Sequence, residues 1–114
     1  MSGKMESLEL MHCAKEALLS KKAANITIFD VRHTSPVTDY YMIASGSTAA
    51  QLKAMVNALS TSLKTTGFKI RVSGVPDDGW VVVDLFDVVI HIFQTEVRDY
   101  YSIEELWADS PRVE

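Results

Sequence analysis

The stretch WVVVDLFDVVIHIF, residues 80–93, decides the fold of this chain. It contains two runs of mainly β-branched residues, 80–85 and 88–93, with almost nothing between them. Such residues favour strands, and two strands joined by so short a connection form a hairpin. We therefore predict an antiparallel β-hairpin here.

The register of this hairpin follows from its side chains. With Leu85 and Phe86 as the two turn residues, the facing pairs are Asp84–Asp87, Val82–Val89 and Trp80–His91. One face then consists of aliphatic side chains only. The other face carries Trp80, Asp84, Asp87, His91 and Phe93. A one-residue slip would mix the two sets, so their separation supports this register.

The polar face of the hairpin has two interpretations. Directly opposed carboxylates such as Asp84 and Asp87 repel each other unless a cation approaches. The face could therefore meet a Lys or Arg of a partner, or a metal. Alternatively, the carboxylates stay hydrated at the strand ends while Trp80 and His91 pack beneath a helix.

Outside the hairpin, helical spacing of apolar residues predicts a first helix over 6–22. It also predicts a second helix, which begins with a capping box formed by Thr48 and Gln51 and ends at Gly67. Further strands are expected at 26–31, 40–44 and 68–72, with a turn-rich loop over 73–79. Thr95 and Ser102 are expected to cap short C-terminal helices. The order αββαβββα predicts an α/β fold, a mixed five-stranded sheet flanked by helices, in one domain over 1–114.

Composition and charge indicate which kinds of partner this chain can bind. The 114 residues have ordinary globular composition and a net charge of −4. Residues 72–97 contain five acids and no Lys or Arg, so this window carries −5 and leaves +1 elsewhere. Binding to a phosphate backbone requires a basic stripe, which is missing. We expect little or no direct nucleic-acid binding and favour a basic protein partner.

The single cysteine, Cys13, excludes an intramolecular disulfide and fits a reducing compartment. The N-terminus does not resemble a secretory signal, and the longest charge-free run, 40–52, is too short to span a membrane. We expect a cytoplasmic protein without membrane attachment. The three histidines show no metal-ligand spacing, so no metal or cofactor is expected.

Gly46-Ser47 lies at a predicted strand-to-helix junction. Nucleotidyltransferases use such a junction for phosphate, together with carboxylates on a nearby strand that hold metals. Residues 54–63, where those carboxylates would be expected, contain no acid. A tight turn with a helix cap explains the junction equally simply. No catalytic residue is assigned, and a divergent metal-dependent nucleotidyltransferase stays as an alternative.

Aromatic residues gather near the C-terminus: Tyr100, Tyr101 and Trp107, with Arg98 beside them. They fit either of two roles. They could anchor the last helices to the core, or they could anchor an interface, because Trp, Tyr and Arg dominate binding hot spots.

Four stretches together resemble one family. They are TDYYMIASGS (38–47), Gln51, WVVVD with DVVIHIF (80–84 and 87–93), and RDYY with EELW (98–101 and 104–107). The chain is similar to ribosomal silencing factors, the RsfS or Iojap-related family, over about residues 8–107.

The resemblance implies a fold related to nucleotidyltransferases without their catalytic carboxylates. It implies binding to the large ribosomal subunit through its ribosomal protein fourteen, which blocks joining of the small subunit and represses translation under nutrient limitation. Organellar relatives act in ribosome assembly, which is the alternative role. Some members self-associate, so a homodimer is an expected state. The partner surface should combine the polar hairpin face with the C-terminal residues: Trp80, Asp84, Asp87, His91, Arg98, Tyr101 and Trp107.

One position departs from the family pattern. Relatives commonly have Gly in the hairpin turn where this chain has Phe86. A two-residue hairpin turn requires positive φ, which is unfavourable for Phe. This puts the Asp84–Asp87 pairing in question and leaves the resemblance intact.

Overall fold

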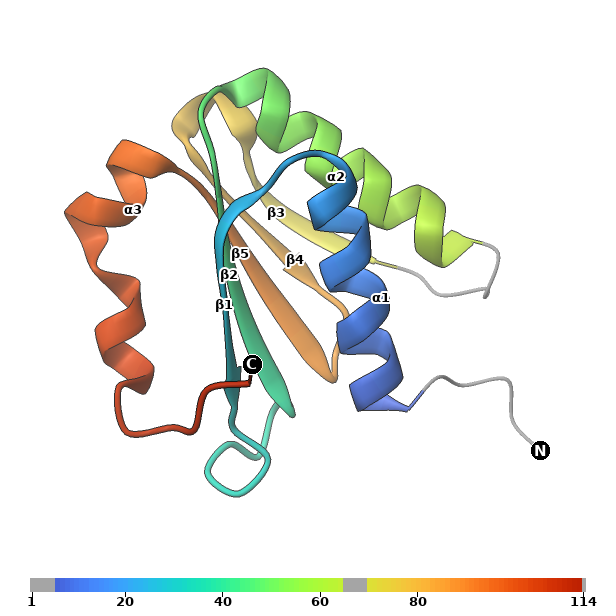
Figure 1. Ribbon diagram of the computed structural model, residues 1–114, viewed down its shortest axis with the longest axis vertical. Coiled ribbons are helices and arrows are strands. Elements are labelled where there is room, and N and C mark those ends of the chain that lie inside the picture. Colours follow the sequence, from blue (N-terminus) through green and yellow to red (C-terminus); the bar gives the residue numbers. More distant parts are fainter. Residues whose placement is uncertain (1–5, 65–69, 114) are drawn as a thin grey trace.

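The computed structural model describes residues 6–64 and 70–113. Its elements follow the predicted order and are drawn in Figure 1. They are α1 (Ser7–Ser20), β1 (Ala24–Asp30), β2 (Tyr40–Gly46), α2 (Ala49–Lys64), β3 (Arg71–Val75), the 3₁₀-helix η1 (Pro76–Asp78), β4 (Trp80–Asp84), β5 (Val88–Gln94), α3 (Thr95–Tyr101) and the 3₁₀-helix η2 (Ile103–Trp107).

The five strands form one sheet in the order β1-β2-β5-β4-β3. Strands β2 and β5 are parallel, and every other neighbouring pair is antiparallel. The parallel pair requires a crossover, which runs through α2 and the β3–β4 hairpin. The predicted mixed five-stranded sheet is confirmed.

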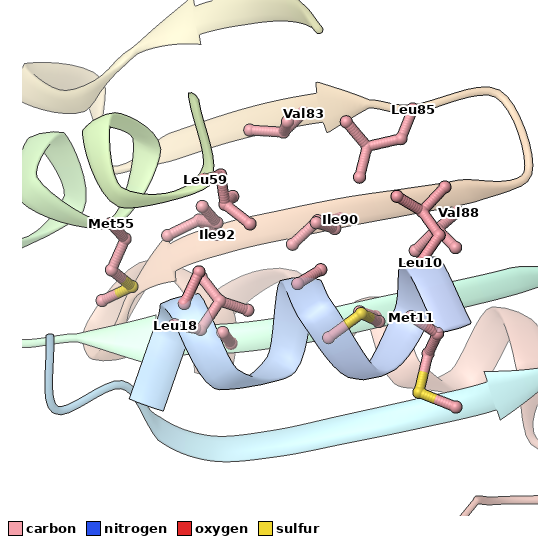
Figure 2. Close-up of a cluster of buried hydrophobic side chains, with 14 of the residues drawn as sticks. Leu10, Met11, Leu18, Met55, Leu59, Val83, Leu85, Val88, Ile90 and Ile92 are labelled. Atoms are coloured by element: carbon pink, nitrogen blue, oxygen red, sulfur yellow. The ribbon is translucent and has the colours of Figure 1, made fainter. Parts of the chain in front are cut away.

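Helices α1 and α2 lie together on one face of the sheet (Figure 1). Both helices direct an apolar stripe inward because their hydrophobic residues recur at helical spacing. Figure 2 shows how these side chains meet the aliphatic side chains of the hairpin. The core on this face includes Leu10, Met11, Leu18, Met55, Leu59, Val81, Val83, Val88, Ile90 and Ile92, all fully buried. We call it the aliphatic face.

The opposite face is covered by α3 and η2 (Figure 1). Its buried core is smaller and consists of Phe29, Val31, Ile43, Phe93 and Ile103. Tyr41, Trp80, Val97 and Trp107 are partly buried against it. We call it the aromatic face.

The hairpin has the predicted faces but a different register. Asp84 pairs with Val89, and Trp80 pairs with Phe93. The predicted Asp84–Asp87 and Trp80–His91 pairs are therefore wrong. The observed register differs by two residues, and because side chains alternate with period 2, the same residues still point to the same faces.

The turn itself is Phe86 and Asp87, since the Leu85 amide donates to the Val88 carbonyl at 2.9 Å. Phe86 has φ 70°, and the Asp87 amide donates to the Leu85 carbonyl at 2.9 Å, which makes a γ-turn centred on Phe86. The Asp84 carboxylate accepts the Phe86 amide at 2.8 Å. The residue with the positive φ that this turn requires is therefore a phenylalanine. The hydrogen bonds of the Phe86 and Asp87 amides hold the turn in this conformation.

Strand β3 corrects the predicted loop over 73–79. It continues to Val75, and only Pro76–Asp78 form a turn, as η1. Gly74 has φ 85°, and a Cβ there would lie 2.5 Å from the Trp80 carbonyl oxygen. The glycine therefore allows a close approach of two strands, although its composition suggested a loop. The predicted helix end at Gly67 and the start of this strand at Phe68 lie outside the described residues.

The predicted helix caps had mixed outcomes. Thr48 Oγ1 accepts the Gln51 amide at 3.1 Å, while Gln51 Oε1 accepts the amide of Ser47 at 2.7 Å, so that cap is confirmed. The predicted capping box at Ser102 is wrong. Ser102 has φ 48° and ends α3, its amide donating to the Arg98 carbonyl. Thr95 is the first residue of α3, and its hydroxyl donates to the Gly46 carbonyl.

The C-terminal residues run along the outer edge of β1. Phe29 pairs with Arg112, the Asp30 amide donates to the Pro111 carbonyl, and the Val113 amide donates to the Ile28 carbonyl. Within residues 6–64 and 70–113, no helix is both long and apolar enough to cross a bilayer.

Candidate functional site

Six of the rings on the aromatic face form a group that we call the aromatic cluster. They come from β2, β4, β5, α3 and η2: Tyr41, Trp80, His91, Phe93, Tyr101 and Trp107. Strand alternation places Trp80 on β4 and His91 on β5 toward this face, while α3 and η2 bring Tyr101 and Trp107 over it. Four of the seven predicted partner-binding residues therefore lie together.

The cluster is a continuous layer of rings. Trp107 stacks on Tyr41 with centroids 4.2 Å apart, and it lies 5.7 Å from the His91 ring. Trp80 stacks on Phe93 at 4.9 Å and meets Tyr101 at 5.2 Å. These distances are those at which aromatic pairs attract beyond their burial. The cluster therefore anchors the C-terminal segment to the sheet while Tyr101, 53% exposed, still faces solvent.

His91 is the polar centre of the cluster. Trp80 Nε1 donates a hydrogen bond to His91 Nδ1 at 3.2 Å, which requires that nitrogen to be unprotonated. Burial lowers the pKa of His91 from 6.5 to about 4, because desolvation disfavours the charged imidazole. At neutral pH His91 is thus an uncharged ring that orients Trp80.

Arg98 lies inside the fold, 6% exposed, although the sequence suggested an interface role. Its Nη1 donates to the Asn25 carbonyl and to Ser45 Oγ, both at 2.7 Å. Its Nη2 donates to Thr27 Oγ1 at 3.1 Å and to Glu104 at 2.9 Å. Both terminal nitrogens therefore have two partners within the chain. Arg98 ties α3 and η2 to β1 and β2, and it is not an accessible contact residue.

Glu104 is the charged partner of Arg98. The hydrogen bond and ion pair with that guanidinium hold the pKa of Glu104 below its usual value. The pair lies at the junction of α3 and η2. The Arg98–Glu104 ion pair therefore fixes the position of η2 over the sheet, where Trp107 stacks on Tyr41.

The two predicted hairpin carboxylates lie toward the opposite end of the hairpin from Trp80. Asp84 is half-buried and is engaged by the Phe86 amide. Asp87 is exposed in the turn, and its carbonyl accepts the amides of Asp39 and Tyr40. Asp87 lies in the turn and Asp84 pairs with Val89, so the two carboxylates do not form an opposed strand pair.

Tyr41 belongs to the cluster and was not among the predicted residues. Alternation along 40–44 could have assigned it to the face opposite Tyr40 and Met42. Its contact with Trp107 was beyond sequence reasoning, because it depends on the parallel pairing of β2 with β5 and on the return of η2.

The Gly46-Ser47 junction is explained by packing and capping. A Cβ on Gly46 would lie 2.7 Å from Met55 Cε and 2.9 Å from Leu52 Cδ1, so glycine allows α2 to approach β2. The Ser47 amide is already bonded to Gln51. The same Gln51 side chain donates to the carbonyls of Lys21 and Lys22, which ties α1 to the start of α2. In the described part of the chain, no three His, Cys, Asp or Glu side chains gather as metal ligands would.

Comparison with known proteins matches this chain to the family "Ribosomal silencing factor during starvation" over residues 4–114. It is 34% identical to "Ribosomal silencing factor RsfS" of Halalkalibacterium halodurans, covering 96% of this chain and 95% of that protein. It is 32% identical to "Mitochondrial assembly of ribosomal large subunit protein 1" of Mus musculus, covering 79% of this chain and 41% of that protein.

The fold has close counterparts among solved structures. A crystal structure of a protein from Chromobacterium violaceum superposes with a TM-score of 0.85 at 36% identity, covering 90% of this chain and 87% of that one. Since the family match spans residues 4–114 and the arrangement of helices and strands recurs in that structure, this chain belongs to the ribosomal silencing factor (RsfS) family.

Proposed function

We propose that this chain binds the large ribosomal subunit through its ribosomal protein fourteen. Once bound, it blocks joining of the small subunit and so represses translation when nutrients are limited. Membership of the ribosomal silencing factor family carries this proposal. The acidic, aromatic surface supports the choice of a protein partner over rRNA.

Charge supports a basic partner. The acidic window of residues 72–97 includes four exposed side chains: Asp77, Asp78, Asp87 and Glu96. Ribosomal proteins that contact rRNA are basic, and opposite potentials steer two proteins together and fix their orientation. The same carboxylates would repel the phosphates of rRNA.

The aromatic cluster supports the location of the docking surface. Interfaces are dominated by a few Trp and Tyr anchors surrounded by polar contacts. We propose a docking surface made of Trp80, Asp84, Asp87, His91, Tyr101 and Trp107. Arg98 is left out because it is buried. His91 would act mainly by orienting Trp80, and Trp107 by stacking on Tyr41.

The proposed mechanism is occlusion without catalysis. A bound protein needs only to occupy the surface that the small subunit would contact. Such a protein acts where ribosomes assemble for translation, in the cytoplasm. No step requires a nucleotide, a metal or a covalent intermediate.

Sedimentation tests the proposal. Purified chain, mixed with ribosomal subunits at low magnesium and centrifuged through a gradient, should migrate with the large subunit. Adding small subunits and magnesium should yield fewer joined ribosomes in its presence. Stable retention on joined, translating ribosomes would refute occlusion. Raising the salt concentration should weaken binding, because the partners carry opposite charges.

A charge reversal tests the hairpin end of the surface. Asp87→Lys should weaken binding by about a hundredfold, since like charges facing each other across an interface cost several kcal/mol. Glu16→Lys on α1 is the matched control, because Glu16 is also exposed and α1 covers the aliphatic face, away from the proposed docking surface. If Asp87→Lys melts and binds like the wild type, the hairpin end does not contact the partner.

Assembly of the large subunit is the second candidate function, and the name of the mouse relative favours it. The same docking surface serves both roles. Depletion of the protein distinguishes them: an assembly factor should leave immature large subunits to accumulate during growth in rich medium, whereas a silencing factor should alter only subunit joining during starvation.

A further inference from the structure

A pocket of about 440 Å³ opens beside the aromatic cluster. It lies between η1, the start of β4 and α3, and its lining consists of Asp78, Trp80, Glu96, Val97, Tyr100 and Tyr101. Trp80 and Tyr101 belong both to this pocket and to the aromatic cluster. Asp78, Glu96 and Tyr100 are not part of the docking surface proposed above, although the sequence placed the two acids in the acidic window and Tyr100 among the C-terminal aromatic residues.

The pocket has aromatic walls. The Trp80 and Tyr101 rings lie 5.2 Å apart with 44° between their planes, and Tyr100 meets Tyr101 edge-on at 5.1 Å and 85°. Tyr100 is 82% exposed. Three of the six lining residues are thus aromatic, and the Tyr100 ring is open to solvent.

The pocket also carries two carboxylates and no basic side chain. Asp78 comes from η1 and Glu96 from α3. Neither has an ion-pair partner among the described residues. Arg98, the basic residue of α3, is directed into the fold toward Glu104 and Ser45 and does not neutralise them. The pocket therefore combines π-faces with uncompensated negative charge.

We propose that this pocket receives an arginine side chain of the basic protein partner; the inference rests on the proposed function and names its anchor. A guanidinium stacks on aromatic faces, attracts their π-electrons and donates several hydrogen bonds in a planar fork to carboxylates. The ammonium of lysine is a compact, strongly hydrated charge, so its attraction to the aromatic walls of the pocket is weaker. A phosphate group is repelled by both carboxylates.

Peptide titration followed by NMR tests the pocket without a ribosome. The probe is acetyl-Gly-Arg-Gly-amide, and the matched neutral probe replaces Arg with citrulline. The arginine peptide should shift the ring resonances of Trp80, Tyr100 and Tyr101, and the citrulline peptide should bind at least about fivefold more weakly. Equal binding of both peptides, or no shift of these rings by either, overturns the proposal. A third probe has Lys in place of Arg. If this lysine peptide binds more tightly than the arginine peptide, the assignment to arginine is overturned.

Variants separate the two contributions. The double substitution Asp78→Asn with Glu96→Gln should abolish the preference for arginine over citrulline, since it removes the charge but keeps the shape. Tyr100→Leu should weaken arginine binding, and Tyr100→Phe should restore it, because only the ring is required. Glu16→Gln, on α1, controls for a general change in charge. If Tyr100→Leu binds the arginine peptide like the wild type, the aromatic wall has no role.

Large subunits distinguish failure of this inference from failure of the proposed function. If the wild type binds large subunits and the double variant binds about tenfold more weakly at low salt, both stand. If the wild type binds and the double variant binds equally well, the pocket is not the anchor and the proposed function is unaffected. If the wild type does not bind at all, the proposed function fails, and the peptide titration alone decides the pocket.

Discussion

The two faces of the sheet are built by the same strands but differ in how they are covered. The aliphatic face lies beneath α1 and α2, and its residues, such as Val83 and Ile90, are fully buried. The aromatic face lies beneath the shorter α3 and η2, and Trp80 and His91 stay partly exposed. Burial of apolar side chains is the main interaction that holds the first cover in place, whereas the second depends on specific hydrogen bonds and ring contacts. The aliphatic face is thus a closed core, and the aromatic face is the side on which we propose docking.

The largest effect should come from Arg98, which holds the cover of the aromatic face. Arg98→Met should cost roughly 3–5 kcal/mol of unfolding free energy, because it strands the buried Ser45 hydroxyl and frees the Glu104 carboxylate from its partner. Chemical denaturation measures it. Arg32→Met is the control: its ion pair with Asp30 is exposed, and such pairs contribute about 0–1 kcal/mol. Comparable losses in both variants would contradict the role of Arg98.

Acid should weaken the aromatic face through His91. Its folded pKa of about 4 lies below the ordinary 6.5, so the unfolded chain binds a proton first as the pH falls. The stability from neutral His91 is complete above pH 6.5 and is lost toward pH 4, up to about 3 kcal/mol. His91→Gln keeps an acceptor for Trp80 Nε1 and does not titrate.

The difference in unfolding free energy between wild type and His91→Gln, measured from pH 7 to pH 4, isolates this contribution. Glu104 and Asp30, whose pKa values are also lowered, titrate in both proteins and cancel. Parallel pH profiles would show that His91 is not desolvated.

Neighbouring valines on β4 compare the two faces directly. Val83→Ala on the aliphatic face should cost roughly 1–3 kcal/mol, because it leaves a cavity in a closed core. Val82 lies on the same strand but is only half-buried. Val82→Ala should therefore cost less than half as much in thermal or chemical unfolding, and equal losses would remove the distinction between the faces.

The smallest effect should come from the hairpin turn. Phe86→Gly relieves the positive φ of Phe86 but loses its contact with Arg71, whose Cζ lies 5.9 Å from the ring centroid. Glycine also loses more conformational entropy on folding. We expect a net gain of about 1 kcal/mol or less, measured as a small rise in Tm. A clear loss would show that the exposed Phe86 ring stabilises the hairpin.

The sequence predicted the parts of the fold that depend on periodicity. Period-2 alternation in residues 80–93 separated the two faces correctly even though the register was wrong by two, because a shift of two residues leaves every side chain on its face. The turn was missed because a γ-turn centred on phenylalanine has no composition signal. Gly74 led to the wrong prediction of a loop over 73–79, because glycine is typical of loops. Here it lies in β3 and allows that strand to pair closely with β4.

The candidate site was harder to predict, since its members come from five different elements. Trp80 and His91 could be placed together because one hairpin carries both. The burial of Arg98 could not be foreseen, because its partners Asn25 and Ser45 lie far away in sequence and meet it only through β1–β2 pairing. Tyr41 depends in the same way on the crossover, whereas the pocket residues Asp78 and Glu96 meet through the β4–β5 pairing, whose register was predicted wrongly.

The C-terminal residues that run along β1 have a consequence for stoichiometry. They pair with β1 at Ile28, Phe29 and Asp30, so this part of the rim is already occupied. Among the described residues nothing pairs with the outer rim of β3, whose side chains are exposed. Addition of a further strand is therefore favoured at the rim of β3. Pairing of the β3 rims of two identical chains would use up both rims and close at two copies.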